Sequence, residues 1–107
     1  MKNILLLGAT GSIGKSVLSV ISENKNKFNL MGISFNSNYS KAEKIINNFL
    51  PKYVYIDDHD CYVKNTNNNG CKFLNGDSSL EQLIKNTEID IIICATSGFA
   101  GLKAASI

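Results

Sequence analysis

Three glycines spaced three residues apart, Gly8, Gly11 and Gly14, lie where an apolar run ends and an amphipathic segment begins. The run at 4–7 predicts a buried strand, and the segment at 12–23 predicts a helix. A strand-to-helix turn of this kind can hold a phosphate, because glycine leaves the backbone open and the first N–H groups of the helix attract an anion. We expect Gly8 to close the strand, Gly11 to admit the phosphates and Gly14 to let the helix pack on the sheet.

The residues between these glycines add hydrogen-bond donors at the same place. Thr10 and Ser12 carry hydroxyl groups, and Ile13 offers a backbone N–H at the start of the helix. An alternative interpretation is that the glycines only make a tight turn. The strand before them and the helix after them favour a dinucleotide site, since the glycine spacing alone would be weak evidence.

A second segment bears on which dinucleotide binds. An NAD site usually has an acidic residue after the second strand, about 20 residues beyond the glycines, which holds the ribose 2′-hydroxyl. No Asp or Glu lies between positions 24 and 42, where the expected turn reads Asn36, Ser37 and Asn38. These neutral donors, a helix N-terminus and Lys41 suit a 2′-phosphate and favour NADP(H). The same residues could also form an ordinary turn with a helix cap.

The elements that position these residues alternate along the chain. The apolar patterns predict strands at 4–7, 29–35, 53–56, 71–74 and 89–95, with helices at 12–23, at 40–50, near 60–64 and from 78. Two Ser-x-x-Glu segments, at 40–43 and 78–81, match the capping box of a helix start. A turn at 96–101 and a helix from 102 are expected next. This order predicts an α/β fold, a Rossmann-like doubly wound parallel sheet.

Residues 1–107 are expected to form one domain that is incomplete. The last residue, Ile107, is apolar and falls within a helix that has barely begun, with no signal for a helix end. We therefore expect a fragment cut inside the first domain of a longer protein.

Composition narrows the class of protein. The net charge of +2 gives no argument for nucleic acid or a membrane surface as a partner. No apolar run approaches the length of about 18 residues that a membrane span needs. Cys61, Cys71 and Cys94 have no C-x-x-C spacing, so reduced thiols and a cytoplasmic location are expected.

Other residues with chemical potential have simpler interpretations. His59 lies in the acidic stretch 57–61, which could be a metal site, but contiguous loop residues rarely converge on one ion and a solvated turn is expected. Cys94 fits a core position better than a nucleophile. The turn at 96–98 could border a nicotinamide ring or could be a plain turn. We predict no catalytic residue and no metal ligand within the chain.

Four stretches resemble the 1-deoxy-D-xylulose 5-phosphate reductoisomerase family. The opening LLLGATGSIGKSVLSVI is similar to the family's N-terminal signature, and FNLMGISFNSN to its second strand and turn. PKYVYIDD resembles the third strand, and IIICATSGFAGLKAASI resembles the fourth long strand and its continuation. The resemblance covers essentially the whole chain.

The resemblance implies an activity and a set of binding residues. The family reduces and isomerises 1-deoxy-D-xylulose 5-phosphate to 2-C-methyl-D-erythritol 4-phosphate with NADPH and a divalent metal, Mn or Mg, as a step towards isoprenoid precursors. The residues it implies for the NADPH phosphates are Thr10, Gly11, Ser12 and Ile13, and those for the adenosine ribose and its 2′-phosphate are Asn36, Ser37 and Asn38.

Two positions depart from the family pattern. Asn36 stands where glycine is usual, and Ser37 where lysine is usual. Lys41 is the candidate to compensate for the missing lysine. The resemblance places the metal-binding carboxylates, an Asn-Lys-Glu substrate segment and a lid beyond residue 107, so residues 1–107 alone are expected to be inactive. A homodimer is expected for the full-length protein.

Two other classes stay open. An extended short-chain dehydrogenase or epimerase shares the glycine pattern but needs Tyr-x-x-x-Lys, and none of the four tyrosines here has a lysine four residues on. A non-catalytic NADP-sensing domain would keep the fold and lose the chemistry.

Overall fold

The computed structural model describes residues 1–65 and 70–95. Strands and helices alternate along these residues in the order β1 (Lys2–Leu7), α1 (Ser12–Glu23), β2 (Phe28–Phe35), α2 (Tyr39–Phe49), β3 (Tyr53–Ile56), α3 (His59–Lys64), β4 (Lys72–Leu74), α4 (Asp77–Ile84) and β5 (Ile91–Cys94). Among the described helices, none combines the length and apolar character needed to cross a membrane.

The strands form one sheet of five in the order β4-β3-β2-β1-β5, and each neighbouring pair is parallel. Strand order runs outward from β1 in one direction and then returns to place β5 on its other side. This reversal is the switch point of a doubly wound sheet. The predicted Rossmann-like α/β fold is therefore confirmed.

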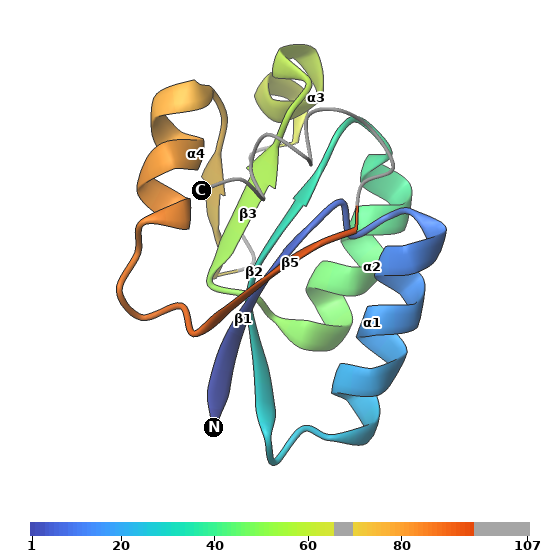
Figure 1. The fold of residues 1–107 in the computed structure, drawn as a ribbon. Coiled ribbons are helices and arrows are strands. Elements are labelled where there is room, and N and C mark those ends of the chain that lie inside the picture. Colours follow the sequence, from blue (N-terminus) through green and yellow to red (C-terminus); the bar gives the residue numbers. More distant parts are fainter. Residues whose placement is uncertain (66–69, 96–107) are drawn as a thin grey trace.

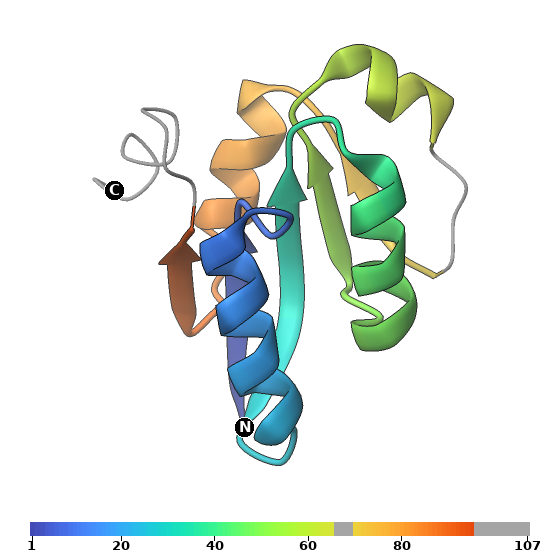
Figure 2. The same ribbon diagram turned by 90° about the vertical axis from the view of Figure 1, so that its right-hand side faces the viewer.

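Helices cover both faces of the sheet. Figure 1 shows α1 and α2 on one side and α4 on the other, and in Figure 2 α1 and α2 lie side by side in front of the strands. Alternate residues of β1 supply both cores: Ile4 and Leu6 belong to the cluster under α1 and α2, and Leu5 and Leu7 to the cluster under α4. This alternation follows from the two-residue period of a strand and explains why the run is apolar throughout.

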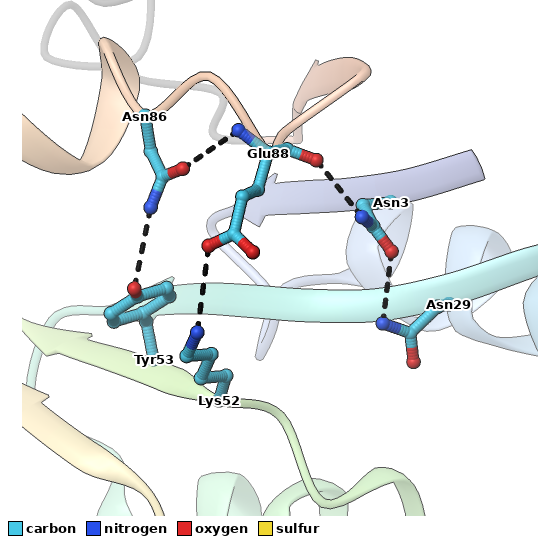
Figure 3. Close-up of polar contacts among 6 residues, drawn as sticks. All are labelled: Asn3, Asn29, Lys52, Tyr53, Asn86 and Glu88. Atoms are coloured by element: carbon cyan, nitrogen blue, oxygen red, sulfur yellow. Dashed lines mark hydrogen bonds and ion pairs between the residues drawn. The ribbon is translucent and has the colours of Figure 1, made fainter.

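A polar network ties the amino ends of the strands together (Figure 3). The Asn3 side chain donates to the Glu88 carbonyl at 2.9 Å and accepts from Asn29 Nδ2 at 3.1 Å. The backbone N–H of Asn3 donates to the Asp90 carboxylate at 2.7 Å, and Lys52 pairs with Glu88 at 3.4 Å. These contacts fix the segment that leads into β5 beside β1, at the opposite end of the sheet from the glycine turn.

Both predicted capping boxes are wrong. Helix α2 begins at Tyr39, and its N-cap is Asn38, whose side chain accepts from the Lys41 N–H at 3.3 Å. The Ser40 hydroxyl donates to the same Asn38 oxygen, so it lies inside the first turn. Asparagine caps as well as serine, and the asparagine comes first along the chain.

Helix α4 likewise starts one residue before the predicted box, at Asp77, with Gly76 as N-cap and no side-chain cap. The Asp77 carboxylate in the first turn supplies the negative charge that a helix N-terminus favours. Strand β5 is shorter than the predicted 89–95, because the Ile89 N–H bonds back to the Asn86 carbonyl at 3.2 Å in a turn. The predicted turn at 96–101 and the helix from 102 lie outside the described residues.

Candidate functional site

The turn after β1 is held in one shape by β2. Gly8 adopts a φ of 82°, in the left-handed region that favours glycine, as expected for the residue that closes the strand. The N–H groups of Gly8 and Ala9 donate to the Ser34 carbonyl at 3.1 and 2.8 Å. Gly8 N–H also lies 3.0 Å from the Ser34 hydroxyl. The turn is therefore part of the sheet's carboxyl edge.

The N-terminus of α1 has neither a capping side chain nor an acidic residue in its first turn. Its first helical hydrogen bond runs from Lys15 N–H to the Gly11 carbonyl at 3.0 Å. The N–H groups of Ser12, Ile13 and Gly14 precede that bond, so they have no partner within the helix. Both Ser12 and Ile13 are exposed. This helix end can accept an anion, because its N–H groups and its dipole are not already neutralised.

The other described helix starts differ. Asn38 and Asp58 cap α2 and α3 with their side chains, and α4 has Asp77 in its first turn. Within residues 1–65 and 70–95, α1 is thus the only helix whose start lacks both kinds of compensation.

The structure separates the roles of two glycines. A Cβ atom on Gly14 would lie 2.5 Å from the Ala9 carbonyl oxygen and 2.7 Å from that of Gly8, so a side chain cannot fit. This confirms that Gly14 allows close packing, and the helix packs specifically on the turn at the end of β1. A Cβ on Gly11 would lie 3.8 Å from the Gly8 carbonyl oxygen, which is ordinary van der Waals contact. Packing within the described chain therefore does not require glycine at position 11.

The α1 N-terminus lies beside the switch point of the sheet. Ala95, directly after β5, donates its N–H to the Leu7 carbonyl at 2.8 Å, and its own carbonyl oxygen would lie 3.9 Å from a Cβ on Gly11. Ligands of open α/β sheets bind outside the carboxyl ends of the strands at such a point. The predicted turn at 96–98 lies outside the described residues.

The second predicted segment, Asn36–Asn38, follows β2 at the same edge of the sheet. All three side chains are exposed. The Asn38 side-chain oxygen serves as the α2 cap, which leaves Asn36 and Ser37 as the side chains not used in that cap. Because β1 and β2 are parallel neighbours, this turn and the glycine turn stand at adjacent strand ends.

Sequence reasoning missed the contact between this turn and the chain after β3. Asp57 and Asp58 donate their N–H groups to the carbonyls of Phe35 and Asn36 at 2.9 and 3.0 Å. The Asp58 carboxylate accepts from the Cys61 N–H at 2.9 Å and so caps α3. The sequence signal for this cap was Asp58, a capping residue directly before a helical segment, and it did not indicate the contact with the turn.

The short helix predicted near 60–64 is confirmed as α3, which begins at His59. The stretch 57–61 is exposed at 57, 59 and 60, as expected, but only 57–58 form a bend and the rest belongs to this helix. The His59 ring lies 3.1 Å, Nδ1 to Oδ1, from Asn75 and packs against Tyr62 with ring centroids 6.4 Å apart. Among the described residues, no three His, Cys, Asp or Glu side chains gather as a possible metal site.

Burial raises the pKa of two titratable groups, one at the start of α2 and one just before β4. Desolvation raises the pKa of Tyr39, at the start of α2, and the Glu43 carboxylate adds to this. Burial also raises the pKa of the Cys71 thiol. Neither group lies among the residues predicted to bind the dinucleotide.

Comparison with known proteins gives one consistent result. The family described as 1-deoxy-D-xylulose 5-phosphate reductoisomerase matches residues 4–106. The enzyme of that name from Ruthia magnifica is 36% identical over 107 residues, which is 98% of this chain and 28% of that protein. The Bacillus subtilis enzyme is 39% identical over 105 residues, 95% of this chain and 27% of that protein.

Solved structures agree. A DOX-P reductoisomerase in complex with NADPH, fosmidomycin and magnesium superposes with a TM-score of 0.87 at 26% identity, covering 97% of this chain and 26% of that one. The Zymomonas mobilis reductoisomerase in complex with NADPH gives 0.83 at 26% identity, covering 96% of this chain and 28% of that one. The chain thus spans about 28% of the length of the curated relatives it matches. Because the family match spans residues 4–106 and the fold agrees with solved members, the chain belongs to the 1-deoxy-D-xylulose 5-phosphate reductoisomerase family.

Proposed function

We propose that residues 1–107 form part of the NADPH-binding domain of a 1-deoxy-D-xylulose 5-phosphate reductoisomerase. The observation that carries this proposal is the N-terminus of α1, which stands at the switch point of the sheet with no capping side chain and no acidic residue. A glycine that packing does not require, Gly11, is its N-cap and leaves room for an incoming phosphate. A pyrophosphate needs this combination of open backbone, unpaired helical N–H groups and positive helix end.

The residues of the two turns have distinct roles in this proposal. Thr10, Gly11, Ser12 and Ile13 hold the pyrophosphate, with the backbone N–H groups at the start of α1 as the main donors. The adenosine ribose and its 2′-phosphate bind at Asn36, Ser37 and Asn38. The nicotinamide supplies a hydride to the substrate when the cofactor is bound.

NADPH is favoured over NADH by the charge at the second turn. A ribose with two free hydroxyls is usually held by a carboxylate after β2, and that carboxylate repels a 2′-phosphate. Here the exposed side chains of Asn36, Ser37 and Asn38 are neutral, and Lys41 lies in the first turn of α2. The Asp58 carboxylate, although near in the fold, is engaged as the cap of α3.

The reaction we propose for the complete gene product is the conversion of the phosphorylated ketose 1-deoxy-D-xylulose 5-phosphate to 2-C-methyl-D-erythritol 4-phosphate, on the route to isoprenoid precursors. Family membership supports this activity, as do the names of the solved relatives. A homodimer in the cytoplasm is part of the same proposal. The described residues of this chain offer no ligand set for a divalent metal, so we assign the metal to none of them.

The family match over residues 4–106 argues against the short-chain dehydrogenase or epimerase alternative. A non-catalytic NADP-sensing domain would bind the cofactor as the enzyme does but would not turn over substrate. Measuring both cofactor binding and turnover therefore distinguishes the two. NADPH and NADH are titrated into the complete gene product, and NADPH oxidation is then followed with 1-deoxy-D-xylulose 5-phosphate and Mn²⁺ or Mg²⁺.

We expect tighter binding of NADPH than of NADH and metal-dependent oxidation of NADPH. Equal affinities, or tighter NADH, would contradict the cofactor assignment. Binding without turnover would favour the sensing domain over the enzyme. Residues 1–107 alone are expected to show no turnover, and turnover by them would contradict our view that the catalytic groups lie elsewhere.

A further inference from the structure

One short segment holds three successive carbonyl oxygens of the chain at and after the end of β2. The Asp57 N–H donates to the Phe35 carbonyl at 2.9 Å, and the Asp58 N–H to the Asn36 carbonyl at 3.0 Å. The Cys61 thiol donates to the Ser37 carbonyl at 3.5 Å between sulfur and oxygen. Residues 57–61 therefore form a brace along the turn, which we call the α3 brace.

Cys61 contributes its side chain to this brace, and its own position is fixed by further contacts. Its backbone N–H donates to the Asp58 carboxylate at 2.9 Å, and the residue is 8% exposed within the main core. Asn65 Nδ2 donates to the Cys61 sulfur at 3.6 Å. The same Asn65 nitrogen also donates to the Cys61 carbonyl at 2.8 Å. In the contact with Ser37 the thiol is the donor, because a carbonyl oxygen can only accept.

The brace controls where the dipoles of the turn point. A carbonyl oxygen that faced a dianionic phosphate would repel it. The carbonyl groups of Phe35, Asn36 and Ser37 are instead bonded to the α3 brace, so the donor groups of the turn are left to face the ligand. The Ser37 carbonyl is held twice, by Cys61 and by the Tyr39 N–H at 2.9 Å. The side chains of Asn36 and Ser37 remain exposed at the same time.

We propose that the α3 brace, through Cys61 and its cap Asp58, positions the Asn36–Asn38 turn for the 2′-phosphate of NADPH and so contributes to the choice of NADPH over NADH. This inference rests on the proposed function, because it needs the 2′-phosphate to bind at this turn. Cys61 and Asp58 are positioning residues in this view, since they act through the turn and do not touch the cofactor.

Cys71 offers a matched control for Cys61. Both are buried cysteines of the same core, 7% and 8% exposed, and Cys71 precedes β4 instead of bonding to the turn. Changing either one to alanine removes the same atoms from the same core. The variants Cys61→Ala, Cys61→Ser and Cys71→Ala are prepared in the complete gene product, and KM for NADPH and NADH and kcat are measured for each.

We expect Cys61→Ala to raise KM for NADPH by about threefold to fivefold with little change in kcat, as for loss of one hydrogen bond that orients a binding group. KM for NADH should stay within about twofold, because NADH has no 2′-phosphate to place. Cys61→Ser, whose hydroxyl can still donate, should recover most of the NADPH preference. Cys71→Ala should leave the ratio of the two KM values as in the wild type.

If the ratio of KM for NADPH to KM for NADH is the same in Cys61→Ala and Cys71→Ala, the inference is overturned. It is also overturned if Cys61→Ser has no stronger preference for NADPH than Cys61→Ala. A second pair tests the brace even if Cys61→Ala does not fold: Asp58→Asn keeps a capping oxygen and Asp58→Ala removes it. Only Asp58→Ala should lose NADPH preference, and equal ratios in the two would overturn the inference. A wild-type protein that does not bind NADPH contradicts the proposed function itself, which is a separate outcome.

Discussion

Two glycines of the first turn should respond in opposite ways to the same added methyl group. Gly11 has φ −82° and ψ 177°, which any residue can adopt, and its Cβ would be in ordinary contact. Gly11→Ala gains about 0.4–1 kcal/mol by restricting the unfolded chain. It loses a similar amount, about 0.5–1 kcal/mol, because alanine is a poor N-cap. The free energy of unfolding should therefore change by less than about 1 kcal/mol.

Gly14→Ala places its methyl carbon 2.5 Å from the Ala9 carbonyl oxygen, which is backbone and cannot rotate away. Replacing glycine inside a helix gains about 1 kcal/mol. A 2.5 Å overlap with backbone falls at the upper end of the overpacking range, about 3 kcal/mol, and outweighs that gain. We expect Gly14→Ala to lower the free energy of unfolding by about 2 kcal/mol.

Binding should follow the reverse order. The Gly11→Ala methyl occupies the space proposed for the phosphates, so we expect Kd for NADPH to rise at least about tenfold, equivalent to about 1.4 kcal/mol. Urea unfolding and fluorescence titration of NADPH, on both variants of the complete gene product, measure the two quantities. Equal losses of stability and binding in Gly11→Ala, or unchanged binding, would refute the reasoning that assigns Gly11 to the ligand.

The remaining predictions concern stability. Asn38→Ala should lower the free energy of unfolding by about 1 kcal/mol, because it removes the α2 cap. Ser40→Ala should change the free energy of unfolding by less than about 0.5 kcal/mol. Urea unfolding of the two variants checks this, and a larger loss for the serine variant would contradict the observed cap. Burial raises the pKa of Cys71 above its ordinary 9.0, and the pKa values of Tyr39 and Tyr55 above their ordinary 10.0. Above these ordinary values the folded protein keeps protons that the unfolded chain releases. The free energy of unfolding should therefore fall as the pH rises above 9 and then above 10. Unfolding curves at successive pH values should show that the first part of this fall, just above pH 9, is absent in Cys71→Ala, and an unchanged fall would contradict the assignment.

Sequence patterns were most informative where one strong period governs an element. The bounds of α1 and β3 agree with the structure, because apolar residues at helical spacing or in a short buried run leave little freedom. The glycine turn was also predictable, since glycines between a buried strand and a helix have few structural roles. Gly14 packs closely as expected, which its spacing from Gly8 already indicated.

Features that depend on contacts across the fold were not predictable. Ser37, Asn38 and Ser40 all suit a helix cap, and the sequence could not rank them because the choice depends on where the chain leaves β2. The α3 brace joins residues more than 20 positions apart, and only the pairing of β2 with β3 brings them together. The start of β5 was misplaced because its apolar run extends into a turn that Asn86 sets.

A crystal structure of the complete gene product with NADPH is the most direct test of the central claim, which is that the α1 N-terminus holds the cofactor's pyrophosphate. We predict pyrophosphate oxygens within hydrogen-bond distance of the Ser12 and Ile13 N–H groups, with the 2′-phosphate beside Ser37. A pyrophosphate bound away from the turn at 8–14, with α1 making no contact to it, would contradict the account.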